Sequence, residues 1–287
     1  MRKLSILFLN ASTVAVCLLA VLWELDAAGV YLSLTGSTRI ELIAFSPTTF
    51  LMGRPKSTSA PADTTSQEAA QPEHKVSLSA FSIGKYPITV EQYCEFLNAV
   101  GFRAAFTENR ALLKDIVEKP RGRFTPRAAR VGFPITYVIP AGAMAFCDWV
   151  SKVSHRKCRL PTEAEWEFAA KGVQGRTYPW GETLPSGNPF GAKVGENPAL
   201  ATPEGVEDLN GPVYQYCLDM FDGDFYKSSP VQDPVCTNGV WHVVRGGPMF
   251  MFMEQLRMPA TWKRFHALET NSLSGFRIVV EGGQVAE

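Results

Sequence analysis

The stretch Arg159-Leu-Pro-Thr-Glu-Ala-Glu-Trp-Glu-Phe-Ala-Ala170, which Tyr178-Pro-Trp-Gly181 follows, predicts a helix with defined ends. Thr162 and Glu165 form a Thr-x-x-Glu capping box, in which the hydroxyl and the carboxylate each satisfy a free backbone N–H at the helix start. Pro161 stiffens the entry, and a glycine such as Gly172 is typical of the residue after a helix. We therefore expect a helix from Glu163 to about Lys171.

Similar signals indicate two further helices. Thr89 and Gln92 form another capping box, which begins a helix that Gly101 ends. Pro140 suits the first position of a helix that runs to about Ser154, because proline lacks only an N–H that would be unpaired there.

Five cysteines follow the N-terminal segment: Cys94, Cys147, Cys158, Cys217 and Cys236. Cys94 and Cys147 fall on the apolar stripes of predicted helices, so we expect both to be buried. Cys147 with Cys158, or Cys217 with Cys236, are possible disulfides, and the spacing does not decide the connectivity. An odd number of cysteines in an oxidising compartment leaves at least one thiol free or paired between molecules.

Residues 1–28 read as an export segment. Arg2 and Lys3 precede an apolar run from Leu4 to Trp23, and acidic residues follow it. The run suits a signal peptide, and it is nearly long enough to remain as a single N-terminal membrane anchor. Either outcome places the domain outside the cytoplasm, most simply in a bacterial periplasm.

Composition favours one loop-rich domain. The chain has 287 residues, 46% of them hydrophobic, with 20 prolines and 23 glycines, so it can bury a core but does not suggest a helical bundle. Lys plus Arg and Asp plus Glu balance at 28 each. Because no net charge attracts the protein to polyanions, we expect no nucleic-acid partner.

Several motifs together resemble the formylglycine-generating-enzyme (sulfatase-modifying factor) family. They are the capped helix above, the segments Glu73–Leu78 and Phe81–Thr89, Arg245-Gly-Gly247 and Gly275-Phe-Arg277. The resemblance implies an α+β fold, the formylglycine-generating-enzyme variant of the C-type-lectin fold, loop-rich and low in regular secondary structure. It implies that this domain occupies residues 38–283.

One feature of that family is absent from the sequence. Its formylglycine-forming members carry two copper-binding cysteines shortly after the Arg-Gly-Gly motif, and soft thiolates suit monovalent copper. The corresponding positions here are Met251 and Leu256. We therefore expect no copper-thiolate chemistry and no redox cofactor.

The same segment supplies the candidate catalytic residue. Glu254 follows a Met-Phe-Met-Phe-Met run, and apolar neighbours in a cleft raise the pKa of a carboxylate toward that of a useful base. The substrate-binding candidates, which offer stacking and anion-binding groups, are Arg257, Trp262, Arg264 and His266. An ordinary surface carboxylate with basic neighbours is the competing interpretation.

A loop resembling the family's calcium site runs from Asp208 to Tyr216. The resemblance assigns possible structural-calcium ligands to Asp208, Gly211, Val213 and Gln215. Gln215 replaces a glutamate of the family pattern, which keeps an oxygen but removes a negative charge and so weakens calcium affinity.

Among exported members without the copper cysteines, the chain resembles the periplasmic branch that matures pyoverdine siderophores. That resemblance implies an oxidoreductase that oxidises the chromophore of dihydropyoverdine, a siderophore precursor peptide, with dioxygen as the acceptor. The alternative is a non-catalytic periplasmic binding or scaffold protein that kept the family's ligand cleft.

Overall fold

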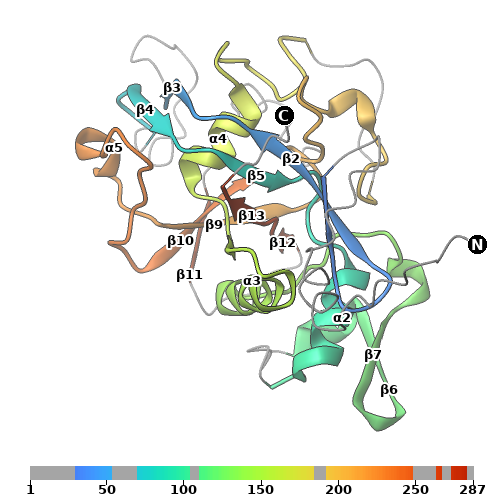
Figure 1. Ribbon diagram of the computed structural model, residues 1–287. Helices are drawn as coiled ribbons and strands as arrows, with labels where there is room; N and C mark the ends of the chain where they lie inside the picture. Colours follow the sequence, from blue (N-terminus) through green and yellow to red (C-terminus); the bar gives the residue numbers. More distant parts are fainter. Residues whose placement is uncertain are drawn as a thin grey trace, which may run out of the picture.

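The computed structural model describes residues 30–53, 70–103, 110–183, 192–247 and 273–282, together with the strand at residues 263–266. It is an α+β fold in which short strands and few helices alternate with long loops (Figure 1). The predicted export segment, residues 1–28, lies outside the described residues. Within the described ranges, no helix has the length and apolar content needed to cross a membrane.

The predicted helices are confirmed with their boundaries. They are α2 (Val90–Val100), α3 (Pro140–Ser154) and α4 (Glu163–Lys171), and a short α5 (Phe225–Ser228) follows later. At α4, Thr162 Oγ1 accepts the N–H of Glu165 at 3.1 Å, while Glu165 Oε2 accepts the N–H of Thr162 at 2.7 Å. Both capping boxes form because each needs only residues three positions apart.

The larger sheet has five strands in the order β1-β2-β5-β13-β8, and neighbouring strands pair antiparallel. Its members are β1 (Val30–Ser33), β2 (Arg39–Phe45), β5 (Phe81–Gly84), β13 (Val279–Glu281) and β8 (Cys158–Arg159). The sheet thus joins the first and last described strands of the chain.

A four-stranded sheet has the order β11-β10-β9-β12. Its members are β9 (Tyr214–Met220), β10 (Trp241–Gly246), β11 (Lys263–His266) and β12 (Ser274–Gly275), and β12 runs parallel to β9. Two hairpins complete the strands: β3 (Thr48–Met52) with β4 (His74–Leu78), and β6 (Ile116–Lys119) with β7 (Arg123–Pro126). The β6–β7 hairpin projects from the body (Figure 1).

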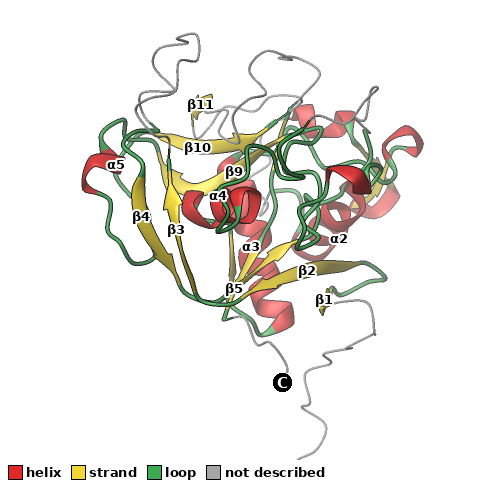
Figure 2. Ribbon diagram, turned by 90° about the horizontal axis from the view of Figure 1, so that it is seen from above, coloured by secondary structure: helices red, strands yellow, loops and turns green. Residues whose placement is uncertain are grey.

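Two hydrophobic clusters hold these elements together. One gathers α2, α3 and the closing strands around stacked and edge-to-face rings, among them Tyr93, Phe146 and Phe276. The other surrounds α4, which packs against β3, β4, β9 and β10 (Figure 2). Trp166 of α4 is fully buried there, so α4 is a core helix rather than a surface one.

The five described cysteines are all free and buried. The expected burial of Cys94 and Cys147 is confirmed, and neither possible disulfide is formed. Burial raises the pKa of Cys94 to about 12 and raises those of Cys147 and Cys217 well above the usual range. These thiols are poor sources of thiolate because the apolar core disfavours the charged form.

Candidate functional site

The Arg245-Gly-Gly247 motif lies at the end of β10 and directly precedes, in the sequence, the segment with the candidate catalytic residue. Gly246 and Gly247 have φ values of 72° and 117°, which side chains rarely adopt. A Cβ on Gly247 would run into the ring of Tyr214, and one on Gly246 into the carbonyl of Leu209. Only glycine therefore allows the chain to leave the sheet here and enter residues 248–262.

Arg245 anchors the end of β10. Its side chain is fully buried and contacts two glutamates of α4, with Nη1 3.1 Å from Glu163 Oε1 and Nη2 2.5 Å from Glu167 Oε2. Its guanidinium also lies over the ring of Trp166, 5.3 Å from the centroid. The end of β10 is therefore held to α4 by charge and by stacking.

Glu163 and Glu167 contact the same arginine, but their pKa values shift in opposite directions. Burial raises the pKa of Glu163 well above its usual range, and Arg245 only partly opposes that effect. Burial would also raise the pKa of Glu167, but Arg245, Lys171 and the N–H of Gly53 together lower it to about 2. Glu167 is thus the charged partner, and Glu163 favours its protonated form.

A third buried carboxylate, Asp219 on β9, lies at the edge of this cluster. Its oxygens accept the N–H of Cys236 at 2.9 Å and that of Glu163 at 2.7 Å. Burial raises its pKa to about 6 despite those hydrogen bonds. The cluster supports the end of β10 through buried, hydrogen-bonded groups rather than through groups open to a substrate.

The sequence prediction missed Glu163 and Glu167 as partners of Arg245. Their spacing of four residues on a buried helix was the available signal, because side chains so spaced share one helix face. The signal does not name the partner, which comes from a distant strand.

The predicted site residues are brought together only in part. In β11, Arg264 pairs across the sheet with Val243, and His266 with Trp241. Glu254, Arg257 and Trp262 lie outside the described residues. In the sequence, these three residues belong to the segment that connects the neighbouring strands β10 and β11. The roles assigned to all five site residues stay predictions.

The loop predicted to hold calcium is crossed by the side chain of Gln215. This residue is fully buried, and its Nε2 donates to the carbonyl of Asp208 at 2.8 Å and to that of Leu209 at 3.2 Å. Its Oε1 accepts from Trp166 Nε1 at 2.9 Å and from Arg277 Nε at 2.6 Å. Both lone pairs of the amide oxygen are therefore used within the protein.

Arg277 completes this arrangement with a positive charge. Its side chain is fully buried and donates to the carbonyls of Gly84 at 2.7 Å, Lys85 at 3.1 Å and Glu207 at 2.7 Å. Burial lowers its pKa to about 9, and the charge of Asp208 opposes that change only in part. Arg277 thus holds Gln215 beside the loop, while the loop carbonyls of Asp208 and Leu209 accept from Gln215.

These contacts test how well the loop fits calcium. A calcium ion needs six to eight oxygens directed at one point, but Gln215 turns its NH₂ group toward the loop carbonyls. Asp208 Oδ2 already accepts the N–H of Gly195 at 2.8 Å. Gln215 thus does not fit as a calcium ligand. The calcium-binding role of Asp208, Gly211 and Val213 stays a prediction.

Comparison with known proteins agrees with this architecture. A sequence model described as the sulfatase-modifying factor enzyme 1-like domain matches residues 37–282. The chain belongs to this family.

Two relatives illustrate the range of proteins that contain such a domain. The chain is 32% identical over 215 residues to "Serine/threonine-protein kinase Pkn1" of Chlamydia trachomatis, which covers 72% of this chain and 34% of that protein. It is 32% identical over 150 residues to the formylglycine-generating enzyme of Streptomyces coelicolor, covering 45% of this chain and 46% of the enzyme. The chain thus spans about a third of the length of the chlamydial protein.

Solved structures share the fold at low sequence identity. PvdO from Pseudomonas aeruginosa matches with a TM-score of 0.61 and 20% identity, over 85% of this chain and 95% of PvdO. Treponema denticola variable protein 1 matches with a TM-score of 0.59 and 19% identity, over 87% of this chain and 98% of that protein. At this level of sequence identity, the matches show that the chain shares the fold of these two proteins and nothing further.

Proposed function

We propose that this protein is a periplasmic oxidoreductase that matures a pyoverdine siderophore. It oxidises the dihydropyoverdine chromophore to pyoverdine, removing two electrons and two protons and passing them to dioxygen, which becomes hydrogen peroxide. The fold shared with PvdO supports the choice of branch. The export segment at residues 1–28 supports the compartment.

The observation that carries the proposal is that the two copper-binding cysteines of the family are replaced in this chain. Met251 and Leu256 occupy the positions of the two copper-binding cysteines. The described cysteines are buried in the core, so they do not replace the missing thiolates. A reaction that needs only a base and a positioned, electron-rich ring is therefore favoured over copper-dependent formylglycine formation.

Glu254 is the proposed base. It removes a proton from the catechol-like ring, which then gives up electrons to dioxygen more readily. Trp262 stacks on the ring, and Arg257, Arg264 and His266 bind the ring and the peptide tail. No metal or organic redox cofactor is part of this proposal, and the buried cluster of Arg245, Glu163 and Glu167 is given no role in the chemistry.

The experiment is to incubate the purified protein with dihydropyoverdine and to follow chromophore absorbance and oxygen uptake. Glu254→Gln keeps the shape of the side chain and removes its basicity. We expect it to lower the rate about 100- to 10,000-fold, the range typical of a lost general base, with an unchanged melting temperature.

A matched control is Glu118→Gln, which makes the same change on the exposed face of the β6–β7 hairpin. It should oxidise the substrate at the parent rate. A Glu254→Gln protein that keeps the parent rate at every pH would remove Glu254 from the mechanism.

The second candidate function is a non-catalytic periplasmic binding or scaffold protein. A bovine relative called inactive Cα-formylglycine-generating enzyme 2 is 26% identical over 196 residues, covering 52% of this chain and 63% of the relative. Its name favours the idea that members of this family persist without catalysis. Saturable binding of dihydropyoverdine without any rate enhancement would support this function and refute the first.

A further inference from the structure

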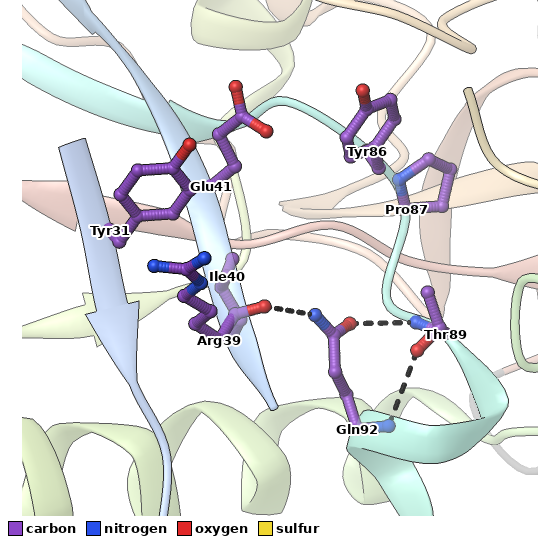
Figure 3. Close-up of a pocket in the computed structure, with 8 residues that line it drawn as sticks. All are labelled: Tyr31, Arg39, Ile40, Glu41, Tyr86, Pro87, Thr89 and Gln92. Carbon is purple, nitrogen blue, oxygen red and sulfur yellow. Dashed lines mark hydrogen bonds between the residues drawn. The ribbon is translucent and has the colours of Figure 1, made fainter. Parts of the chain in front are cut away.

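A pocket of about 300 Å³ lies between the β1–β2 hairpin and the connection from β5 to α2 (Figure 3). It is at the other end of the molecule from β10 and β11 (Figures 1 and 2). The side chains that bear on its chemistry are Tyr31, Arg39, Ile40, Glu41, Tyr86 and Pro87. Its volume falls at the lower end of the range for sites that enclose small molecules.

The walls of the pocket are fixed by hydrogen bonds that involve no ligand. Gln92 accepts the N–H of Thr89 at 2.9 Å and donates to the carbonyl of Arg39 at 2.8 Å, so it ties the start of α2 to β2 (Figure 3). Glu41 accepts from Lys85 at 2.9 Å. A preformed site of this kind loses little conformational freedom on binding.

Two tyrosines form opposite sides of the pocket, with β2 between them (Figure 3). Ile40 and Pro87 contribute buried apolar surface. Tyr86 is half-buried, and its hydroxyl donates to Glu207 Oε1 at 3.3 Å, so its ring is held in place. Paired aromatic walls with an apolar base favour a flat, aromatic ligand.

The charges of the lining favour an anion. Lys85 counters the carboxylate of Glu41. By contrast, among the residues that the structure describes, Arg39 has no carboxylate within ion-pair distance. Its guanidinium lies over the ring of Tyr31, 4.6 Å from the centroid. This arrangement keeps its outward N–H groups available to a carboxylate, which an arginine binds with two parallel hydrogen bonds.

We propose that this pocket binds an aromatic ring that carries a carboxylate, as in the C-terminal aromatic residue of a peptide. The ring lies between Tyr31 and Tyr86, and the carboxylate pairs with Arg39. This site is separate from the segment that carries Glu254, so it does not depend on the oxidation reaction proposed above.

The test is an NMR titration of the full-length protein with N-acetyl-L-tryptophan. We expect saturable shifts of the backbone amides of residues 31 and 39–41 at millimolar probe. N-acetyl-L-tryptophanamide, which has the ring without the carboxylate, should bind at least about tenfold more weakly because it loses a charge-assisted hydrogen-bond pair.

Arg39→Gln should reduce the affinity for N-acetyl-L-tryptophan by a similar factor of about ten. Tyr31→Leu should also weaken binding, since it removes one aromatic wall. Arg123→Gln makes the same charge change on exposed β7, outside the pocket, and should leave the affinity unchanged.

Three results would overturn the proposal. They are unmoved pocket amides at millimolar probe, equal binding of acid and amide, and an unchanged affinity in Arg39→Gln. Because the readout needs no substrate turnover, failure here is distinguishable from failure of the proposed oxidation.

Discussion

Among the residues that the structure describes, two arginines are fully buried, and their surroundings are opposite in kind. Arg245 faces the carboxylates of Glu163 and Glu167, which raise its pKa against the effect of burial. Arg277 faces backbone carbonyls and the amide oxygen of Gln215, and its pKa is lowered to about 9.

The comparison shows two ways in which a protein can stabilise the charge of a buried guanidinium. At Arg245 a full negative charge neutralises the guanidinium, so each partner depends on the other. At Arg277 several partial charges share the task, and the charge of Asp208 adds to them without forming an ion pair with the guanidinium. We call the buried ion-pair cluster of Arg245, Glu163 and Glu167 the ionic lock. We call the hydrogen bonds from Arg277 to Gln215 and to the carbonyls of Gly84, Lys85 and Glu207 the dipolar cage.

The largest expected effect follows from breaking the ionic lock. Arg245→Met leaves Glu167 buried without its main counter-charge, so we expect a loss of about 3–5 kcal/mol in the free energy of unfolding. Urea unfolding at pH 7.5 measures it. Adding Glu167→Gln to this variant should recover part of the loss, because it removes the stranded charge.

A second prediction concerns the pH dependence of the ionic region. The folded pKa of Asp219, about 6, lies above its usual 3.8, so the folded state holds this proton more tightly than the unfolded state. Its contribution is fully present below about pH 4 and is lost as the pH rises through 6. Between pH 4 and pH 7.5, the wild type should lose about 2–3 kcal/mol relative to Asp219→Asn.

The measurement is urea unfolding of both proteins across that pH range. The variant supplies the reference because it has no titrating group at this position. Parallel stability curves would contradict the assigned pKa.

Breaking the dipolar cage should cost less. Arg277→Met removes the donor to the carbonyls of Gly84 and Glu207 and the positive charge near Asp208, but it breaks no ion pair, so we expect a loss of about 1–3 kcal/mol. The same unfolding experiment compares it with Arg245→Met. A larger loss for Arg277→Met would mean that the cage, and not the ionic lock, dominates stability.

The smallest expected effect concerns calcium. Because the amide of Gln215 already donates to the loop carbonyls of Asp208 and Leu209, we expect the melting temperature to change by less than about 1 °C between excess calcium and EGTA. Differential scanning fluorimetry measures this. A calcium-dependent rise of several degrees would show that Asp208, Gly211 and Val213 hold the ion despite the turned amide.

Prediction from sequence succeeded where the deciding contacts are local. The capping boxes at Thr89 and Thr162 need partners only three residues away, and the helices that they begin have the expected bounds. The Arg-Gly-Gly motif contributed to the family resemblance, and the structure shows that its two glycines adopt positive φ values. The family and its fold follow from these short signals taken together.

The candidate site was less accessible because its partners come from distant parts of the chain. The resemblance of its loop to the family's calcium site made Gln215 look like a weakened calcium ligand. The structure shows instead that its amide lies between that loop and Arg277, 62 residues later. The orientation of an amide depends on which donors surround it, and spacing alone does not supply them.

The helix boundaries, the family and the replacement of the family's copper-binding cysteines by Met251 and Leu256 could be predicted from the residues alone. The groups that compensate each buried arginine could be identified only in the folded protein. Arg245 meets glutamates that lie 82 and 78 residues earlier in the chain, whereas Arg277 meets carbonyls up to 193 residues away. The physical reason is that local hydrogen bonds form within a turn, while the neutralisation of a buried charge requires groups that only the packed core brings together.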